Sequence, residues 1–182
     1  MRSFSERIDA ANKVLGEALA WLTSLMVLVT FVIVVLRYAF DTGWIWLQES
    51  VTWMHALVFM LAAAYTLGLD EHVRVDIFYR RMDAEKKALV NLLGALFLLT
   101  PTWLLLIIVS WDYVAASWSV YESSREAGGL PALFLLKSVI PLTALLMLLQ
   151  GLSQALSGFF AARSRSPQAT PGTDSVKRGT GL

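Results

Sequence analysis

The sequence predicts an all-α integral membrane protein with four transmembrane helices, an N-terminal amphipathic helix and both termini in the cytoplasm. Four runs without Asp, Glu, Lys or Arg occupy residues 18–36, 50–69, 88–111 and 138–162. At about 1.5 Å per residue, a helix of each length crosses a hydrocarbon core of about 30 Å. Hydrophobic residues make up 57% of the chain and charged residues 16%, against roughly 25% charged in soluble domains. We therefore expect one compact helical bundle in the membrane.

The charges set the orientation of the spans. Most basic residues lie in the N-terminal segment, the second connection and the C-terminal tail: Arg2, Arg7, Lys13, Arg74, Arg80, Arg81, Lys86, Lys87, Arg163, Arg165, Lys177 and Arg178. The first and third connections contain only Arg37, Arg125 and Lys137. Because Lys and Arg accumulate on the cytoplasmic side, the N-terminal segment, the second connection and the C-terminal tail are predicted to face the cytoplasm.

Residues 1–17 precede the first span, 18–36, and form an amphipathic pattern. Phe4, Ile8, Ala11 and Leu15 recur at spacings of four, three and four, which is the period of one helix face. The pattern predicts an interfacial helix that leads into the first span. A docking helix for a partner subunit is the alternative.

The first outer connection runs from Arg37 and Tyr38 to Glu49, at the mouth of the second span, 50–69. A turn is expected at its centre, around Gly43. Arg37 and Glu49 both lie near the predicted outer surface. They either pair across the two helices or remain separately solvated, since exposed ion pairs contribute little.

The inner connection, 70–87, is rich in charge and alternates between apolar and polar residues from His72 to Ile77. Such alternation presents two different faces, so one face is expected to pack against lipid, the bundle or a partner. Asp83 is positioned to cap the third helix, which contains the span 88–111.

The second outer connection, 112–137, leads to a fourth helix predicted to begin near Pro131, which gives a span of about 132–162. A start at Ser138 remains open. Lys137 is expected to extend toward the outer surface, and Pro141 is expected to kink the helix. The tail, 163–182, is rich in Ser, Thr, Pro and Gly and is predicted to be disordered.

Few polar groups lie at membrane depth, and none of them indicates catalysis. His55 is placed in the outer third of the second span and Gln150 near the middle of the fourth. His72 follows His55 by 17 residues, about 25 Å along a helix, which disfavours a shared haem or metal site. Interhelical hydrogen bonds are the expected role of His55 and Gln150. No span shows a polar stripe of the kind that a channel needs, and the sequence predicts no cofactor and no enzyme activity.

Several motifs occur in an order and spacing that carry a family likeness. The first span ends in Arg37-Tyr38, and a Trp-rich connection reaches Glu49. The second span passes through 62–64, an Ala triplet, to the sequence HVRVD at 72–76, and Pro141 lies early in the fourth span. Over residues 8–162 the chain resembles the small permease subunit of TRAP transporters, the DctQ-like family.

The resemblance implies a function, partners and a location. Such a subunit braces a large permease subunit during sodium-coupled uptake of an organic acid, which a periplasmic substrate-binding protein delivers. It lies in the bacterial or archaeal cytoplasmic (inner) membrane and binds no substrate itself. The residues implied at the interface with another subunit or with lipid are Arg37, Tyr38, Glu49, His72, Arg74 and Asp76. Two alternatives remain: simple anchoring of the spans by these charges, and a membrane anchor or scaffold of a different complex.

Overall fold

The computed structural model describes residues 2–69, 79 and 81–164. These residues form helices and connections, with no strand among them. Four of the described helical stretches are long and apolar enough to cross a membrane, which confirms the predicted all-α class with four membrane-crossing helices. The elements are α1 (Arg2–Ala39), α2 (Ile45–Gly68), α4 (Ala84–Gly94), the π-helix η1 (Ala95–Leu99), α5 (Thr100–Ser119) and α6 (Leu133–Ser164).

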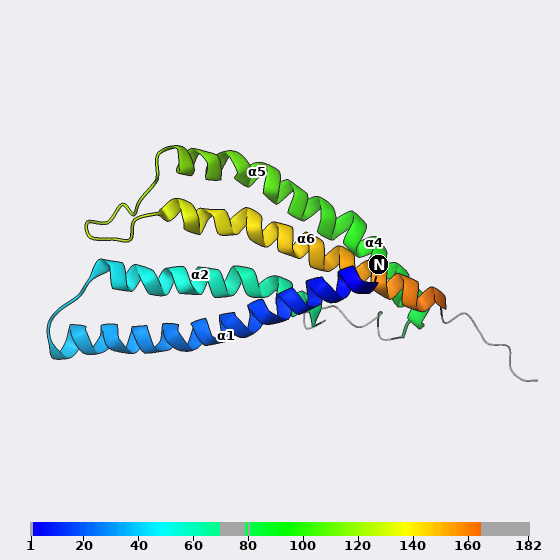
Figure 1. Cartoon of the computed structure of the whole chain (residues 1–182), viewed down its shortest axis with the longest axis horizontal. Helices are drawn as coiled ribbons and strands as arrows, with labels where there is room; N and C mark the ends of the chain where they lie inside the picture. The colour runs from blue at the N-terminus through cyan, green and yellow to red at the C-terminus, as the bar shows by residue number, and fades with distance from the viewer. Residues whose placement is uncertain (1, 70–78, 80, 165–182) are drawn as a thin grey trace, which may run out of the picture.

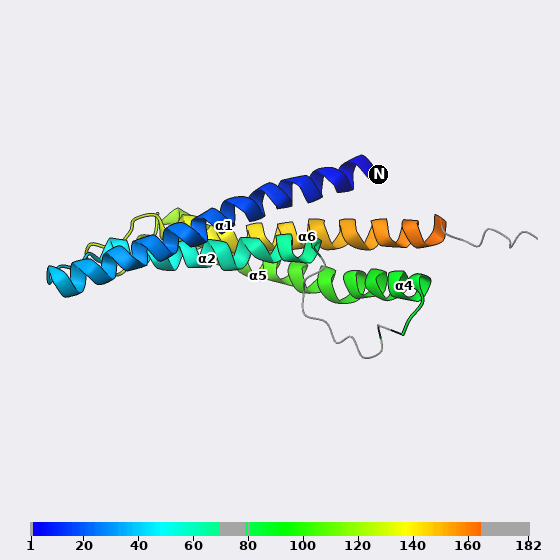
Figure 2. The same cartoon turned by 90° about the horizontal axis from the view of Figure 1, so that it is seen from below.

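The helices lie side by side in one twisted layer rather than in a compact bundle. We call the end that holds the connections 40–44 and 120–132 the outer end, after the predicted orientation. Across the outer half the order is α1, α2, α6, α5, and at the inner end α6 lies between α1 and α4 (Figures 1 and 2). A membrane protein tolerates this open arrangement because lipid is as apolar as the side chains it meets.

The central position of α6 is visible in its burial. Of the residues in its most apolar 18-residue stretch, 33% are buried, against 6% in the spans formed by α1 and by α4 to α5. A small core cluster joins three helices through Leu19, Leu61 and Val139. Many other large apolar side chains are exposed, among them Phe31, Phe97 and Leu105, as expected for side chains that meet lipid or another subunit.

α1 is one continuous helix of 38 residues. An interfacial helix over 1–17 was predicted to lead into the first span, and the described backbone shows no break between the two. Figure 2 shows the N-terminal half of α1 on the opposite side of α6 from α4. Its placement in the membrane interface stays a prediction.

α2 begins at Ile45, five residues before the expected start of the span at Ser50. The preceding connection makes the expected turn, in which Asp41 has a positive φ of 50° and Thr42 N–H donates to the Leu36 carbonyl over 3.0 Å. The early start matters for depth. His55 becomes the eleventh of 24 residues in α2, so it lies near the middle of the helix and not in its outer third.

The third span is a single helical stretch from Ala84 to Ser119, longer than the expected 88–111 at both ends. Asp83 occupies its N-cap position, but its side chain makes no capping hydrogen bond and lies 3.3 Å from Lys86 Nζ. The π-helix η1 interrupts it just before Pro101, which lacks an N–H group and crowds the carbonyl of residue 97, four positions earlier. The wider π-turn accommodates this proline, and the Thr100 hydroxyl donates to the Ala95 carbonyl over 2.7 Å.

The second outer connection is consequently short, 120–132, and α6 begins at Leu133. This start agrees with the expectation of a beginning near Pro131. α6 continues through Pro141 without interruption, and the expected kink stays a prediction.

Candidate subunit interface and its supporting contacts

A buried hydrogen bond ties α1 to α6 in the inner half of the molecule. The Asn12 side-chain amide donates to Gln150 Oε1 over 2.6 Å. Asn12 is 4% exposed and Gln150 only 1%. The predicted interhelical role of Gln150 is thereby confirmed. Asn12 was not predicted from the sequence, although it follows Ile8 by four positions and therefore lies on the apolar face of its helix.

Two glycines permit the close approach of the helices around this bond. A Cβ atom on Gly16 of α1 would lie 2.5–2.7 Å from ring atoms of Tyr65 on α2. A Cβ atom on Gly68 would lie 2.9 Å from Gln150 Nε2. Distances below 3.0 Å require atoms to move, so the absence of a side chain at both positions sets the spacing of α1, α2 and α6.

At the outer end, the carboxylate of Glu49 fastens the connection 120–132 to α2. Glu49 Oε2 accepts a hydrogen bond of 2.6 Å from the Leu130 backbone N–H, and Glu49 Oε1 accepts one from the Ser124 hydroxyl. A Cβ atom on Gly129 would collide with both Ser124 and Glu49. The described contacts include no ion pair between Arg37 and Glu49. Arg37 is exposed, and Glu49 binds the connection 120–132 instead.

A second outer contact joins the same connection to α6. Lys137 pairs with Glu122, and the Ser117 hydroxyl donates to Glu122 over 2.7 Å. Lys137 Nζ also lies 4.1 Å from the centre of the Tyr113 ring, a cation–π geometry. Two hydrogen bonds lower the pKa of Glu122, and the one from Lys137 has a larger effect than the one from Ser117. Together with Glu49, this cluster holds a connection in which Tyr121, near one end, and Ala132, at the other, both have positive φ.

His55 does not make the hydrogen bond that the sequence analysis expected. It is exposed, and within the described residues its ring only stacks on Phe59, with ring centres 6.3 Å apart. Gln48 and Thr52 are exposed on the same face of α2. The start of α2 at Ile45 thus produces a short polar stripe, Gln48, Thr52 and His55, that was not recognised from the sequence.

The remaining sequence-predicted positions divide into two groups. Tyr38 is 84% exposed at the outer end of α1, next to the exposed Arg37. His72, Arg74 and Asp76 lie outside the described residues. Their predicted interface roles, and that of Pro141 as a kink, stay predictions.

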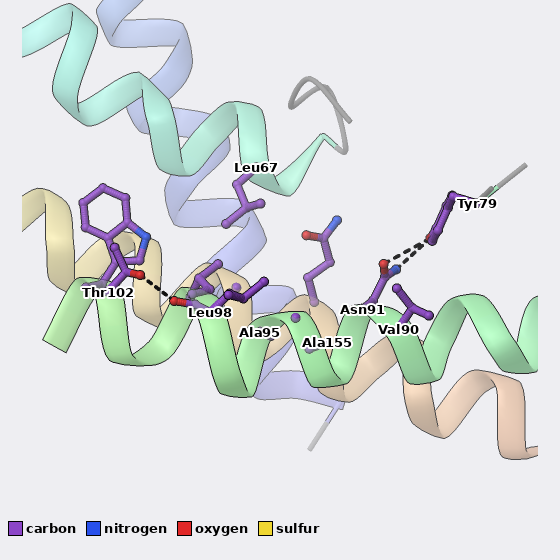
Figure 3. A pocket seen from close by; sticks show the side chains of 13 residues that line it. Leu67, Tyr79, Val90, Asn91, Ala95, Leu98, Thr102 and Ala155 are labelled. Atoms are coloured by element: carbon purple, nitrogen blue, oxygen red, sulfur yellow. Dashed lines mark hydrogen bonds between the residues drawn. The ribbon is translucent and has the colours of Figure 1, made fainter. Parts of the chain in front are cut away.

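A shallow groove of about 530 Å³ runs between α2, the third span and α6 (Figure 3). Its walls are mainly apolar, including Leu67, Leu98 and Ala155. At one end the Asn91 amide donates to the Tyr79 hydroxyl over 2.9 Å. No group of three or more His, Cys, Asp or Glu residues is placed to hold a metal ion in the described part of the chain. The groove offers a mainly apolar surface for packing.

Comparison with known proteins agrees with this description of a helical membrane component. The family model described as "Tripartite ATP-independent periplasmic transporters, DctQ component" matches residues 26–161. A curated relative, the C4-dicarboxylate TRAP transporter small permease protein DctQ of Vibrio cholerae, is 28% identical over 113 residues. That alignment covers 62% of this chain and 48% of the relative, so the chain spans about half of its length. With a family match over most of its residues and four membrane-crossing helices, the chain is a multi-pass membrane protein that belongs to the DctQ family of TRAP transporter small permease subunits.

Proposed function

We propose that this subunit braces the large permease subunit of a TRAP transporter in the cytoplasmic membrane. The transporter takes up an organic acid that a periplasmic substrate-binding protein delivers, and a sodium gradient drives the uptake. The observation that carries this proposal is the open layer of helices. Only 6% of the residues in the most apolar 18-residue stretch of α1, and of α4 to α5, are buried, so the layer leaves apolar surface available to a larger partner as well as to lipid.

The polar residues of the described spans support a bracing role. Gln150 is bonded to Asn12, and the four apolar runs contain no Asp, Glu, Lys or Arg. A subunit that binds an organic acid and sodium needs charged or carbonyl ligands at membrane depth. We infer that these ligands belong to the partner chain. The name of the Vibrio relative makes a C4-dicarboxylate one candidate substrate.

The positive-inside pattern supports a topology in which both termini are cytoplasmic. Glu49 and the connection 120–132 then face the periplasm, on the side of the binding protein. Reporter fusions after residue 164 and within 120–132 test this orientation. A periplasmic signal from the fusion after residue 164 would overturn it.

Affinity purification of the tagged chain from its own membranes, with mass spectrometry of the proteins recovered, tests the partnership. We expect a large polytopic permease in a near one-to-one ratio. Recovery of the chain alone, or with an unrelated enzyme, would contradict the proposal and favour an anchor or scaffold of a different complex.

Reconstitution in liposomes tests the transport role. Uptake of an organic acid should require this chain, the large permease, the binding protein and an inward sodium gradient. Arg74→Ala and Asp76→Ala should reduce recovery of the large permease while leaving membrane insertion intact. Normal recovery and normal uptake in both variants would contradict their proposed place at the interface.

A further inference from the structure

The exposed Ser, Thr, Asn, Gln and His side chains described on the membrane helices make a hydrogen bond within the chain, with one group of exceptions. Among the buried polar atoms described on these helices, the Thr143 hydroxyl has no partner. Exposed hydroxyl groups on the spans bond to their own helix: Thr30 donates to the Met26 carbonyl over 2.7 Å and Thr102 to the Leu98 carbonyl over 2.7 Å. The amide of Gln150 is buried and bonded to Asn12. Such arrangements spare lipid from unpaired polar groups.

Gln48, Thr52 and His55 break this rule together. Among the exposed Ser, Thr, Asn, Gln and His side chains described on the spans, these three make no hydrogen bond within the chain. Their spacing of four and three residues places them on one face of α2. His55 lies about 15 Å along α2 from the outer end of the helix.

Lipid tails cannot form hydrogen bonds with Gln48, Thr52 and His55. Ionisable and hydrogen-bonding side chains at such depth ordinarily face another part of the protein, because hydrocarbon offers no partner for their polar atoms. The exposed face of α5 provides the contrast within the same chain. Its residues Leu105, Ile108 and Val109 are 61–68% exposed and entirely apolar, as lipid requires.

The surface beside His55 is also shaped to receive a side chain. A hollow of about 320 Å³ lies between α1 and α2, lined by Met26, Val27, Thr30, Val51 and His55. Phe59, which is 74% exposed, extends the same face one turn further inward. A neighbouring helix that inserts one side chain into this hollow brings its polar atoms within reach of the stripe.

We propose that the face formed by α1 and α2 around His55 is the docking surface for a transmembrane helix of the large permease subunit, which supplies hydrogen-bonding side chains to Thr52 and His55. This inference rests on the proposed function, because it takes the partner to be that subunit. It adds the side of the helix layer on which the partner lies. The apolar face of α5 is left to lipid.

Site-specific crosslinking tests the proposed side directly. The chain has no cysteine, so single-cysteine variants can carry a photoactivatable group without competing labels. Phe59→Cys on α2 and Leu105→Cys on α5 form a matched pair: both side chains are exposed, at 74% and 61%, and both lie about 21 Å from the outer end of their helices. In native membranes we expect a crosslink to the large permease from position 59 and none from position 105.

Substitution of the stripe gives a second readout. His55→Leu should reduce recovery of the large permease about 3- to 20-fold, the range for loss of one interhelical hydrogen bond, and His55→Gln should retain most of it. Thr102→Val is the control, since that hydroxyl bonds only to its own helix. Equal recovery with His55→Leu and Thr102→Val would overturn the proposal.

The outcomes separate this inference from the proposed function. If the wild-type chain recovers the large permease but crosslinks arise at position 105, equally at both positions, or at neither, the docking surface is wrong and the bracing role stands. A crosslink from position 59 only to lipid, to a second copy of the chain or to its own 70–78 segment also overturns the docking surface. If the wild-type chain recovers no large permease, the proposed function itself fails.

Discussion

The side-chain amide of Asn12 and Oε1 of Gln150 are joined by a hydrogen bond of 2.6 Å across 138 positions of sequence. This bond fastens the N-terminal half of α1 to the central helix. Loss of one interhelical hydrogen bond costs about 0.6–1.7 kcal/mol in membrane proteins. Asn12→Leu and Gln150→Leu should each destabilise the folded chain by about that amount or more, with coupling visible in a double-mutant cycle.

The same pair distinguishes stability from transport. We expect Gln150→Leu to reduce thermal stability in detergent while uptake by the assembled transporter survives, because the bond connects helices and contacts no substrate. Complete loss of uptake in a stably assembled Gln150→Leu complex would assign Gln150 a direct role in transport.

Gly16→Ala should destabilise the chain, because the new Cβ atom would lie 2.5–2.7 Å from the Tyr65 ring. Gly94→Ala is the matched control: it is also a helical glycine, and nothing lies within 4 Å of its Cβ position. Alanine favours helix by about 1 kcal/mol over glycine, so the control should be neutral or stabilising. Thermal unfolding of the two variants in the same detergent checks this contrast. Equal melting temperatures would show that α1 can move away from Tyr65 without cost.

Glu49→Ala should release the connection 120–132 from α2. Hydrogen bonds to a charged group contribute about 1.5–3 kcal/mol, so the released form should become at least about tenfold more populated. Arg125 within this connection is exposed, and its rate of cleavage by trypsin in the purified protein measures the change. Gln48→Ala, one position away and with no side-chain hydrogen bond in the described chain, serves as the control and should leave the cleavage rate unchanged.

The ion pair of Glu122 and Lys137 predicts a dependence on acid. Because Lys137 and Ser117 lower the pKa of Glu122 in the folded state, its stabilising contribution is complete above the ordinary pKa of glutamate. That contribution is lost as the pH falls through the lowered value. The wild-type chain should therefore be more stable than Glu122→Gln at neutral pH, and the two should converge in acid. A difference that persists unchanged in acid would contradict this assignment.

The sequence was sufficient for the helices because lipid imposes a strict requirement on the backbone. The uncharged runs identified all four membrane-crossing stretches, and the start of α6 at Leu133 agrees with the signal at Pro131. Boundaries at the interfaces were less accurate. Trp44 and Trp46 suit both membrane and connection, so the first turn of α2 was assigned to the preceding connection.

The contacts between helices were harder to predict because they depend on which faces meet. Gln150 was recognised as an interhelical residue, but its partner Asn12 lay in a segment expected at the membrane surface. Glu49 was placed correctly near the outer end, whereas its bonds to Ser124 and the Leu130 backbone depend on a turn whose geometry no periodicity encodes. The stripe of Gln48, Thr52 and His55 was not predicted, because the positions of these residues along α2 depend on the helix beginning at Ile45.

The position of α6 in the layer has a consequence for biosynthesis. Of the four described membrane-crossing stretches, the one that separates α2 from α5 is the last to be synthesised. Until α6 has been synthesised, the α1–α2 pair and the third span have no shared neighbour within the described chain. Asn12 also lacks its hydrogen-bond partner Gln150. Assembly of this subunit should therefore be completed only after synthesis of its fourth span, and truncation before Leu133 should leave α1 and α2 associated but the third span free to be degraded.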